Sequence, residues 1–374
     1  MSKPKILIDA RMVGPSLHGI AKYVLHMAEA IRLLGPGLPY ELIFLVRKGL
    51  EDETRRSLEP FEIVENDLPF LNWKETFALR KVIAKVAPAL FHSPSFSSVP
   101  GCPCPWVQTI HDLNHLSYGT FFKRTYYERF LKPFALGAKK LMTVSEFSRM
   151  EISLWLRIAK TSIALVPNAI DPPWPEEKTE AATDRVLARF GLTRKRYFFS
   201  LSNSKPHKNL ELLTKAYIDF RRHLTRAAVA DVWPLVLSVP ERDHLLPVTE
   251  GVVWTGYLSV EEVQVLLTQA AGLFYPSLYE GFGRPPLEAV VVGTPCVVSR
   301  IPPHEESLAG IGGKSVQYVA ATDFQGWIES FHRIREGKGQ RIPKELANSV
   351  LERFSLVRMA KALDRVYRDV LNVP

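Results

Sequence analysis

Short apolar runs alternate with longer amphipathic segments along the first half of this 374-residue chain. A short apolar run indicates a buried strand, whereas apolar residues three or four positions apart indicate a helix. Strands are predicted at Lys5–Asp9, Leu42–Val46, Phe61–Val64, Leu90–His92, Trp106–Ile110, Leu141–Val144 and Ala164–Val166. Helices are predicted between several of them, at about Ile20–Leu34, Trp73–Lys85 and Glu146–Ile158. This alternation predicts an α/β domain with a mostly parallel sheet.

A second series of the same kind begins with a strand at Tyr197–Leu201, followed by a polar loop and a helix that ends near Arg222. Its later elements are strands at Leu235–Ser238, Val252–Trp254, Leu273–Tyr275 and Cys296–Ser299, and a helix at Val263–Ala270. The chain is also too long for one ordinary core, so length and pattern both predict two domains. The segment between them has the composition of a linker, with Pro172, Pro173, Pro175, Glu176, Glu177 and Glu180.

Polar loops follow several of these predicted strands. Parallel α/β sheets bind ligands at the carboxyl ends of their strands, and His111 with Asp112 directly follows such a strand. A glycine loop from Gly14 to Gly19 follows the first strand, but it lacks the G-x-G-x-x-G pattern, so an NAD site is not supported. In the second series, a loop between strand and helix carries Asn203, Lys205, His207 and Lys208, which would place cations beside a helix N-terminus.

The most informative stretch runs from Phe274 to Ser299. A predicted strand leads into a loop that ends in Glu280-Gly281-Phe282-Gly283, and Pro285 and Pro286 suit the first turn of a helix. The amides of a helix N-terminus attract anions. Two carboxylates beside that terminus, Glu280 and Glu288, suit the hydroxyls of a sugar or ribose. A site that offers both matches a nucleotide sugar.

Glu280 and Glu288, with seven residues between them, resemble the Glu-x7-Glu motif of retaining glycosyltransferases of family four, which have the GT-B fold. The flanking residues also match, in Pro276-Ser277, Pro286-Leu287-Glu288-Ala289 and Gly293-Thr294-Pro295. The resemblance covers nearly the whole chain and is most specific from Asn203 to Ser299. It implies an α/β fold of two Rossmann-like domains that face each other across a cleft.

The resemblance also implies what each domain does. Residues 1–171 would form the acceptor-side domain, and residues 185–354 would bind the nucleotide sugar. The final helix, about residues 355–374, would cross back onto the first domain. In the first domain, Gly19 would lie against the donor phosphates or the acceptor, and His111 would meet the donor sugar.

The remaining site residues would come from the second domain. Lys208 would hold the donor diphosphate, Glu280 the sugar hydroxyls and Glu288 the ribose. Relatives often carry an arginine near this lysine, and here Lys205 or His207 would have to supply that second cation. His111, Lys208 and Glu280 are thus the expected catalytic residues, and the expected donor-binding residues are Gly19, Asn203, Lys205, Lys208, Glu280, Gly281, Phe282, Gly283 and Glu288.

The implied reaction moves a hexose from a GDP- or UDP-linked sugar to a glycan or lipid-linked acceptor, with retention of anomeric configuration. No Asp-x-Asp occurs in the sequence, which removes the usual metal–diphosphate clamp of the other major glycosyltransferase fold. We therefore expect no metal and no cofactor. The leaving diphosphate would be stabilised by Lys208 and helix-end amides.

Composition narrows the partners and the location. The formal net charge of +9 is compatible with nucleic acid, an anionic membrane or an anionic small substrate, and also with a generally basic surface. No run of eighteen apolar residues and no signal peptide are found, and three cysteines make neither a disulfide framework nor a zinc site. A cytoplasmic location is predicted.

Aromatic and basic residues alternate in one predicted helix from Phe121 to Phe134. Such a helix can lie in a membrane interface, which would place the protein at the inner face of the cytoplasmic membrane, or it can be a core helix with a charged outer side.

Two other classes of function stay open: a sugar-nucleotide epimerase or a phosphorylase on a similar scaffold, and a basic nucleic-acid-binding protein. The sequence contains no recognisable nucleic-acid-binding module, so no nucleic-acid partner is expected.

Overall fold

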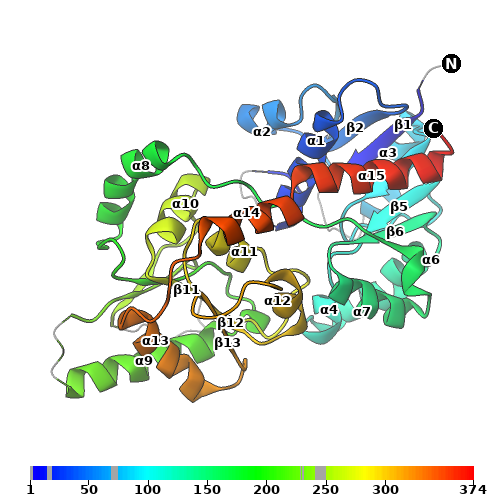
Figure 1. The fold of residues 1–374 in the computed structure, drawn as a ribbon. Helices are drawn as coiled ribbons and strands as arrows, with labels where there is room; N and C mark the ends of the chain where they lie inside the picture. The colour runs from blue at the N-terminus through cyan, green and yellow to red at the C-terminus, as the bar shows by residue number, and fades with distance from the viewer. Residues whose placement is uncertain (1–2, 15–18, 69–74, 228, 230, 241–249) are drawn as a thin grey trace. The chain divides into compact units, whose positions relative to one another are not determined.

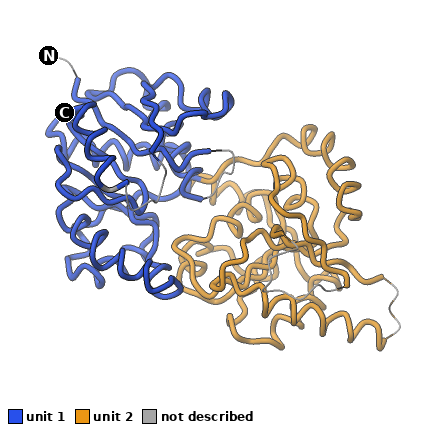
Figure 2. Tube along the Cα trace, turned by 180° about the vertical axis from the view of Figure 1, so that it is seen from behind, with its two compact units in different colours: residues 1–169, 354–374 blue, residues 170–353 orange. Residues whose placement is uncertain are grey.

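A computed structural model describes residues 3–14, 19–68, 75–227, 229, 231–240 and 250–374. The chain divides into two compact units, residues 1–169 with 354–374, and residues 170–353 (Figure 2). Each unit is built on one parallel sheet. The prediction of two Rossmann-like α/β domains is therefore confirmed, and the C-terminal helix belongs to the first unit.

The first unit contains a seven-stranded sheet in the order β3-β2-β1-β4-β5-β6-β7. All six neighbouring pairs are parallel. Its strands are β1 Lys5–Asp9, β2 Glu41–Arg47, β3 Glu62–Asn66, β4 Leu90–Ser93, β5 Trp106–Thr109, β6 Lys140–Thr143 and β7 Ile163–Leu165. The strand order turns at β1, so the chain crosses from one side of the sheet to the other between β3 and β4.

The helices of the first unit separate these strands (Figure 1). They are α1 Gly19–Leu33, α2 Asp52–Ser57, α3 Glu75–Val86, α4 Asn114–Ser117, α5 Phe121–Tyr126, the π-helical turn η1 Tyr127–Leu131, α6 Lys132–Leu136, α7 Glu146–Leu156, the 3-10 turn η2 Lys160–Ser162, and α15 Leu356–Leu371. Ser145 caps α7, because its side chain accepts a hydrogen bond from the amide of Ser148, as its position before the helix predicts.

Helix α15 packs against α1, although more than 300 residues separate them along the chain (Figure 1). Its buried side chains share one face, at Met359, Ala360, Leu363, Val366 and Tyr367. The Tyr367 hydroxyl lies 2.7 Å from Nδ1 of His92 in β4. Because this contact is buried, it ties the end of the chain to the centre of the first sheet.

The second unit contains a six-stranded parallel sheet in the order β10-β9-β8-β11-β12-β13. Its strands are β8 Phe198–Ser200, β9 Leu235–Leu237, β10 Val252–Trp254, β11 Gly272–Tyr275, β12 Cys296–Ser299 and β13 Val316–Val319. Its helices are α8 Glu176–Arg189, the 3-10 turn η3 Pro206–Lys208, α9 Leu210–Arg226, α10 Val260–Gln269, α11 Arg284–Val291, α12 Pro302–Ser307, α13 Phe324–Arg335 and α14 Lys344–Arg353.

An aromatic cluster holds α9 and α13 against this sheet. Phe274 of β11 stacks on Phe331 of α13, with ring centroids 4.2 Å apart, and Phe198 of β8 meets both rings edge-on. Phe220 of α9 closes the cluster from the neighbouring helix. This packing fixes β8 and β11, which lead into the loops of the candidate site.

The linker prediction was wrong in part. Residues 172–184 lie within the second unit, and α8 begins among them at Glu176. Prolines and glutamates suggested a linker, but Pro175 stands just before the helix, and Glu176 and Glu177 in its first turn complement the helix dipole. The helix is held by small and apolar side chains that lie on one buried face: Thr179, Ala182, Thr183, Val186 and Leu187.

The basic aromatic segment from Phe121 to Phe134 is a continuous helical stretch with two different faces. Tyr127 and Leu131 are buried in the core of the first unit. By contrast, Phe121 and Phe122 are 78% and 82% exposed, and Lys123 beside them is exposed as well. The core interpretation therefore holds for the inner face, while the outer face keeps an aromatic and basic surface.

Candidate functional site

The loops after β8 and β11 meet because these strands are neighbours in the second sheet. Two hydrogen bonds join the loops directly: the amide of Leu278 donates to the His207 carbonyl at 2.7 Å, and Nδ2 of Asn209 donates to the Pro276 carbonyl at 3.2 Å. The loops lie at the carboxyl edge of a parallel sheet, where such folds bind ligands. They bring Lys208 and Glu280 into contact.

Lys208 and Glu280 form a nearly buried ion pair. Nζ of Lys208 lies 2.7 Å from Oε1 of Glu280, and each side chain is only 11% exposed. Nζ of Lys208 also donates to the Tyr275 hydroxyl at 3.1 Å, and the Ser277 hydroxyl donates to the same Oε1 at 2.6 Å. Among the described residues no hydrogen bond involves Oε2 of Glu280, so this oxygen can accept a bond from a ligand hydroxyl.

The ion pair keeps both groups charged near neutral pH. Burial alone would raise the pKa of Glu280, but the charge of Lys208 and the hydrogen bonds from Lys208 and Ser277 lower this pKa to about 2. Burial likewise would lower the pKa of Lys208, but the charge of Glu280 raises it above its ordinary value. Glu280 is thus a hydrogen-bond acceptor and not an acid.

Helix α11 begins at Arg284, at the end of the loop that carries Glu280. Gly283 is its N-cap residue, with φ +84°, a conformation that favours glycine. Pro285 and Pro286 follow in the first turn, so two of its first amides are absent and the terminus offers fewer donors than a helix start with free amides would. At its other end, Val292 is the C-cap residue of α11, and Gly293 follows with φ +81°, a conformation that again favours glycine.

Glu288, expected to bind ribose, is one turn along α11. Its Oε1 accepts a hydrogen bond from Nη2 of Arg284 at 3.2 Å, and the Glu288 side chain is 20% exposed. Arg284 therefore offsets the charge of this carboxylate. The sequence interpretation gave Arg284 no role, although its position four residues before Glu288 allows this i,i+4 pair.

The two candidates for a second cation differ in their surroundings. Burial and the neighbouring Lys208 charge lower the pKa of His207 to about 4, so this imidazole is neutral at pH 7. Lys205 is exposed, and its amide donates to Oδ1 of Asn203 at 3.2 Å. Of the pair proposed from sequence, only Lys205 can carry a positive charge in this state.

Gly281 and Phe282 complete the loop between Glu280 and α11, and both are buried. Together with Lys208, Glu280 and Glu288, they place most of the expected donor-binding set around the edge formed by β8 and β11. The two expected residues of the first unit are Gly19 and His111, and each is described within that unit. Gly19 is the first residue of α1, while most of the loop before it lies outside the described residues.

His111 lies just beyond the carboxyl end of β5 and is 7% exposed. Its Nε2 lies 2.9 Å from the Pro94 carbonyl, and its ring meets Tyr23 edge-on, with centroids 4.7 Å apart. A carbonyl can only accept, so Nε2 carries the proton in this contact. The position at a strand end agrees with the sequence prediction, and its contact with a donor sugar stays a prediction.

Several residues of this site were missed from the sequence. Tyr275 and Ser277 contact the ion pair, Asn209 anchors the lysine loop, and His304 of α12 is buried behind Gly283. Tyr275 and Ser277 flank Pro276 at the end of a predicted strand, which was a usable signal. His304 lay in a segment to which no chemistry was assigned, and its burial depends on packing that is not visible in the local pattern.

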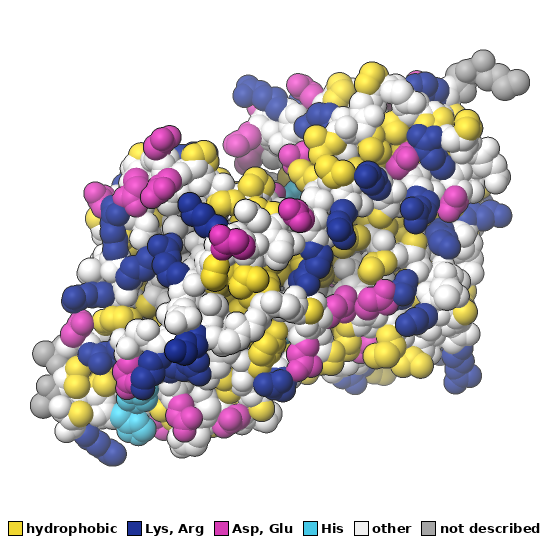
Figure 3. Space-filling view, viewed as in Figure 1, with side chains coloured by type: hydrophobic (Ala, Val, Ile, Leu, Met, Phe, Trp, Pro, Cys, Tyr) yellow, Lys and Arg dark blue, Asp and Glu magenta, His cyan; other side chains and the backbone are white. Residues whose placement is uncertain are grey.

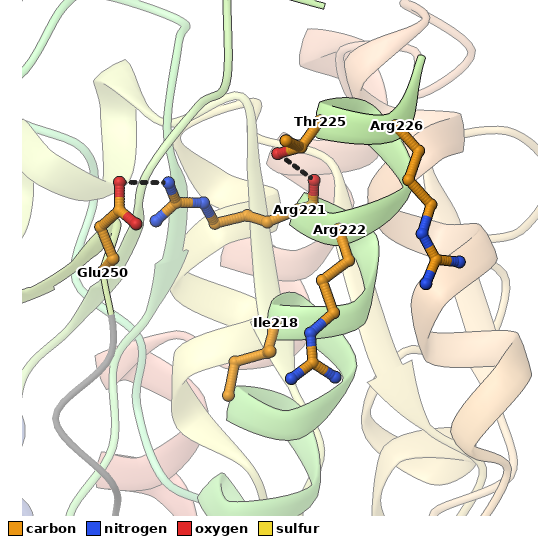
Figure 4. A pocket seen from close by; sticks show the side chains of 6 residues that line it. All are labelled: Ile218, Arg221, Arg222, Thr225, Arg226 and Glu250. Carbon is orange, nitrogen blue, oxygen red and sulfur yellow. Dashed lines mark hydrogen bonds and ion pairs between the residues drawn. The ribbon is translucent and has the colours of Figure 1, made fainter. Parts of the chain in front are cut away.

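A separate shallow pocket of ≈ 350 Å³ lies on the C-terminal half of α9 (Figure 4). Its lining residues are Ile218, Arg221, Arg222, Thr225, Arg226 and Glu250. Arg221 donates to Glu250 at 2.9 Å, whereas Lys208 precedes the opposite end of the helix. The pocket is thus distinct from the Lys208–Glu280 site.

On the face shown in Figure 3, Lys and Arg side chains are interspersed with Asp and Glu. The positive charge in this view is therefore spread and does not form one continuous patch. In the part of the chain that the structure describes, no three His, Cys, Asp or Glu side chains come together as metal ligands would. Over the same residues, no helix has the length and apolar character needed to span a bilayer.

Two known families match this chain. The family described as Glycosyltransferase Family 4 matches residues 17–173, and the family described as Glycosyl transferases group 1 matches residues 187–310. Together these matches span about three quarters of the chain. They cover both units, including the loops that carry Lys208 and Glu280.

Two curated relatives act in O-antigen synthesis. The O-antigen chain mannosyltransferase RfbU of Salmonella typhimurium is 25% identical over 229 residues, which are 61% of this chain and 60% of that protein. The O-antigen chain mannosyltransferase B of Escherichia coli is 29% identical over 240 residues, 60% of each chain. The matched part thus spans about 60% of the length of these relatives.

Solved structures resemble the whole chain. HepE of Anabaena, in complex with UDP and glucose, has a TM-score of 0.72 at 15% identity and covers 98% of this chain and 100% of its own. WaaG, a glycosyltransferase involved in lipopolysaccharide biosynthesis, has a TM-score of 0.69 at 12% identity and covers 97% and 99%. These likenesses confirm the predicted GT-B fold.

Proposed function

We propose that this chain, whose two units match the family four and group 1 glycosyltransferases, transfers a hexose from a nucleoside-diphosphate sugar to a glycan or lipid-linked glycan. The O-antigen mannosyltransferases among its relatives favour mannose over glucose and cell-surface polysaccharide as the product. The observation that carries the proposal is the Lys208–Glu280 pair at the carboxyl edge of the second sheet.

The Lys208–Glu280 pair offers a cation for the leaving diphosphate and a hydrogen-bond acceptor for the neighbouring sugar. The ammonium group of Lys208 would offset charge that develops on the diphosphate as the glycosidic bond breaks. Oε2 of Glu280 would accept a hydrogen bond from a sugar hydroxyl and orient the ring. Glu288, already next to Arg284, would accept from the ribose hydroxyls.

Glu280 is poorly suited to be a nucleophile. Its Oε1 already accepts hydrogen bonds from Lys208 and Ser277, and its low pKa reflects a stabilised and therefore less nucleophilic carboxylate. We propose that configuration is retained without a covalent sugar on the enzyme and without a metal ion, with the leaving phosphate taking the acceptor proton. A glycosylated enzyme seen by intact mass would contradict this part.

A binding panel tests the donor. GDP, UDP, ADP and dTDP are titrated by calorimetry in the presence of EDTA, and then GDP-mannose and UDP-glucose. Selective binding of one nucleotide and its sugar conjugate is expected. Absence of binding to all of them would overturn the proposed function, and binding only after Mg²⁺ addition would overturn the metal-independent part.

We also propose that the outer face of α5 contacts an anionic membrane surface, which would bring the enzyme to a lipid-linked acceptor. The side chains of Phe121 and Phe122 are largely exposed to water, and the neighbouring Lys123 and Arg124 are exposed as well. Exposed aromatic side chains beside cations match an interface of headgroups and acyl chains. This contact would place the protein at the inner face of the cytoplasmic membrane.

A further inference from the structure

His304 of α12 is a buried imidazole with one unused nitrogen. The side chain is fully buried, and its Nδ1 lies 2.8 Å from the Ser299 carbonyl. Because a carbonyl can only accept, Nδ1 must carry the proton, and Nε2 of the neutral ring is then a bare lone pair. Among the residues that the structure describes, this Nε2 has no hydrogen-bond partner. A buried polar atom without a partner is uncommon and needs an explanation.

The unused nitrogen is directed at the start of α11. A Cβ atom built on Gly283, the N-cap residue of this helix, would lie 3.2 Å from Nε2 and 3.0 Å from Cδ2 of His304. The imidazole edge is therefore packed against the backbone where Gly283 leads into the helix. This is the terminus that would receive the donor diphosphate.

Two cations of the site are already matched by carboxylates, and the third, Lys205, is exposed to water. Lys208 is paired with Glu280, and Arg284 with Glu288. A bound diphosphate would add two negative charges to this balanced set, and the prolines at the start of α11 leave few amides to compensate them. An additional positive charge beside the helix terminus would lower the free energy of the complex.

We propose that His304 takes up a proton from solvent at Nε2 when a nucleotide sugar binds, and so becomes an additional, buried cation of the donor site. This inference rests on the proposed function. Protonation at Nε2 breaks no existing hydrogen bond, because Nδ1–H continues to donate to the Ser299 carbonyl. The proton returns to solvent when the nucleoside diphosphate leaves.

The surrounding charges set the direction of this change. Burial lowers the pKa of His304 most, Glu280 raises it and Lys208 lowers it, with the net result below the ordinary value, so the ring is neutral before the ligand binds. The charged or titratable groups on the elements around it are Lys208 of η3, Tyr275 and Glu280 of β11 and its loop, Arg284 of α11, and Glu305 and Glu306 of α12. A nearby anion raises the pKa of an imidazole, so binding favours the protonated ring.

Calorimetry measures this proton directly. GDP-mannose and UDP-glucose are titrated into the protein at pH 6 to 8, in buffers with different ionisation enthalpies. The diphosphate diester of these ligands does not titrate in this range, so any proton taken up belongs to the protein. Uptake of up to one proton is expected, with an affinity that falls by up to about tenfold per pH unit as pH rises through the pKa of the bound state.

Three variants locate the proton. His304→Asn keeps a donor for the Ser299 carbonyl but lacks Nε2, and it should abolish the uptake and flatten the pH dependence. His207→Gln removes the other buried imidazole near the site, and His223→Asn removes an exposed one, and both should leave the uptake unchanged. Uptake that persists in His304→Asn would overturn the inference.

The wild-type protein provides a readout that does not depend on a stable variant. With ¹⁵N-labelled histidine, the Nε2 resonance of His304 should move to the range of a protonated nitrogen when the ligand is added. Tight binding without this shift and without proton uptake would overturn the role of His304 alone. Absence of binding would instead overturn the donor site itself.

Discussion

At the scale of single residues, the site depends on one ion pair between distant positions. Lys208 and Glu280 are 72 residues apart in the chain, yet Nζ and Oε1 lie 2.7 Å apart and nearly out of water. Separating such a pair leaves a buried charge without compensation, which costs more than breaking an exposed pair. The local stability of the second unit therefore depends on it, and so would the proposed function.

Lys208→Ala should lower kcat/KM by about ten- to a hundredfold, since a charge-assisted hydrogen bond to a phosphate contributes about 1.5–3 kcal/mol. Steady-state kinetics with the selected nucleotide sugar measure this change. Lys215→Ala is the matched control, because Lys215 is on helix α9, which follows the Lys208 turn, and pairs with Glu211 at the exposed surface. Equal kinetics for the two variants would remove Lys208 from the site.

The same pair predicts a dependence of stability on pH. The pKa of Glu280 is depressed from 4.5 to about 2, so its contribution is present above pH 4.5 and is lost as pH falls toward 2. The pKa of Lys208 is raised, so its contribution is present below 10.5 and is lost as pH rises beyond that value. The pair therefore stabilises the fold in the window between these limits.

Urea unfolding of wild type and Glu280→Gln tests the acid side of this window. The difference in the free energy of unfolding should shrink by about 3 kcal/mol between pH 5 and pH 2, since one pKa unit corresponds to about 1.4 kcal/mol. Glu250→Gln is the control, because Glu250 is 91% exposed. A difference that stays constant with pH would contradict the assigned pKa.

At the scale of elements, one helical segment of the first unit is partly buried in the core and partly exposed to water. The stretch formed by α5, η1 and α6 buries Tyr127, Leu131 and Phe134 in the first unit while it leaves Phe121 and Phe122 in water. The π-helical turn η1 follows the exposed residues and itself supplies the buried Tyr127 and Leu131. A wider turn of this kind interrupts the regular α-helical periodicity, so the exposed and the buried side chains of this stretch do not follow one regular helical stripe.

Reversing two charges on α5 tests the membrane proposal. Lys123→Glu with Arg124→Glu should weaken binding to anionic vesicles by more than about tenfold, since each basic residue near such a surface contributes about 1 kcal/mol. Vesicle co-sedimentation measures it. Lys215→Glu with Arg222→Glu makes the same charge change on exposed positions of α9 and should bind as wild type does. An equal loss of vesicle binding in both double variants would mean that net charge causes it, and this would contradict a specific contact through α5.

At the scale of the whole molecule, the last helix of the chain completes the core of the first unit. Helix α15 returns to the first unit and packs on α1, so residues from both ends of the chain share one core. Two polar contacts fix its position: Tyr367 with His92, and Tyr40 with Asp364 at 2.8 Å. The first unit cannot reach its final packing before the end of the chain is available.

Tyr367→Phe should lower the stability of the first unit by about 1–3 kcal/mol, because it removes the hydroxyl and leaves Nδ1 of His92 buried without a partner. Chemical unfolding measures the loss of stability, and hydrogen exchange shows whether it lies in the first unit. The affinity for nucleotide should stay unchanged. Tyr257→Phe is the control, since Tyr257 is 87% exposed. A loss confined to the second unit would contradict the role of α15.

Short-range patterns along the chain were enough to predict the local elements and the chemistry of the loops. Apolar runs and glycine or proline positions act over a few residues, so the strands, the cap at Gly293 and the Glu280–Glu288 spacing could be predicted, as could Lys208 beside a helix start. Which of these groups come into contact depends on the three-dimensional fold. The Lys208–Glu280 contact, the burial of His304 behind Gly283 and the packed face of α8 all depend on strand order and long-range packing. Those are fixed by burial across the whole fold, and no local pattern encodes them.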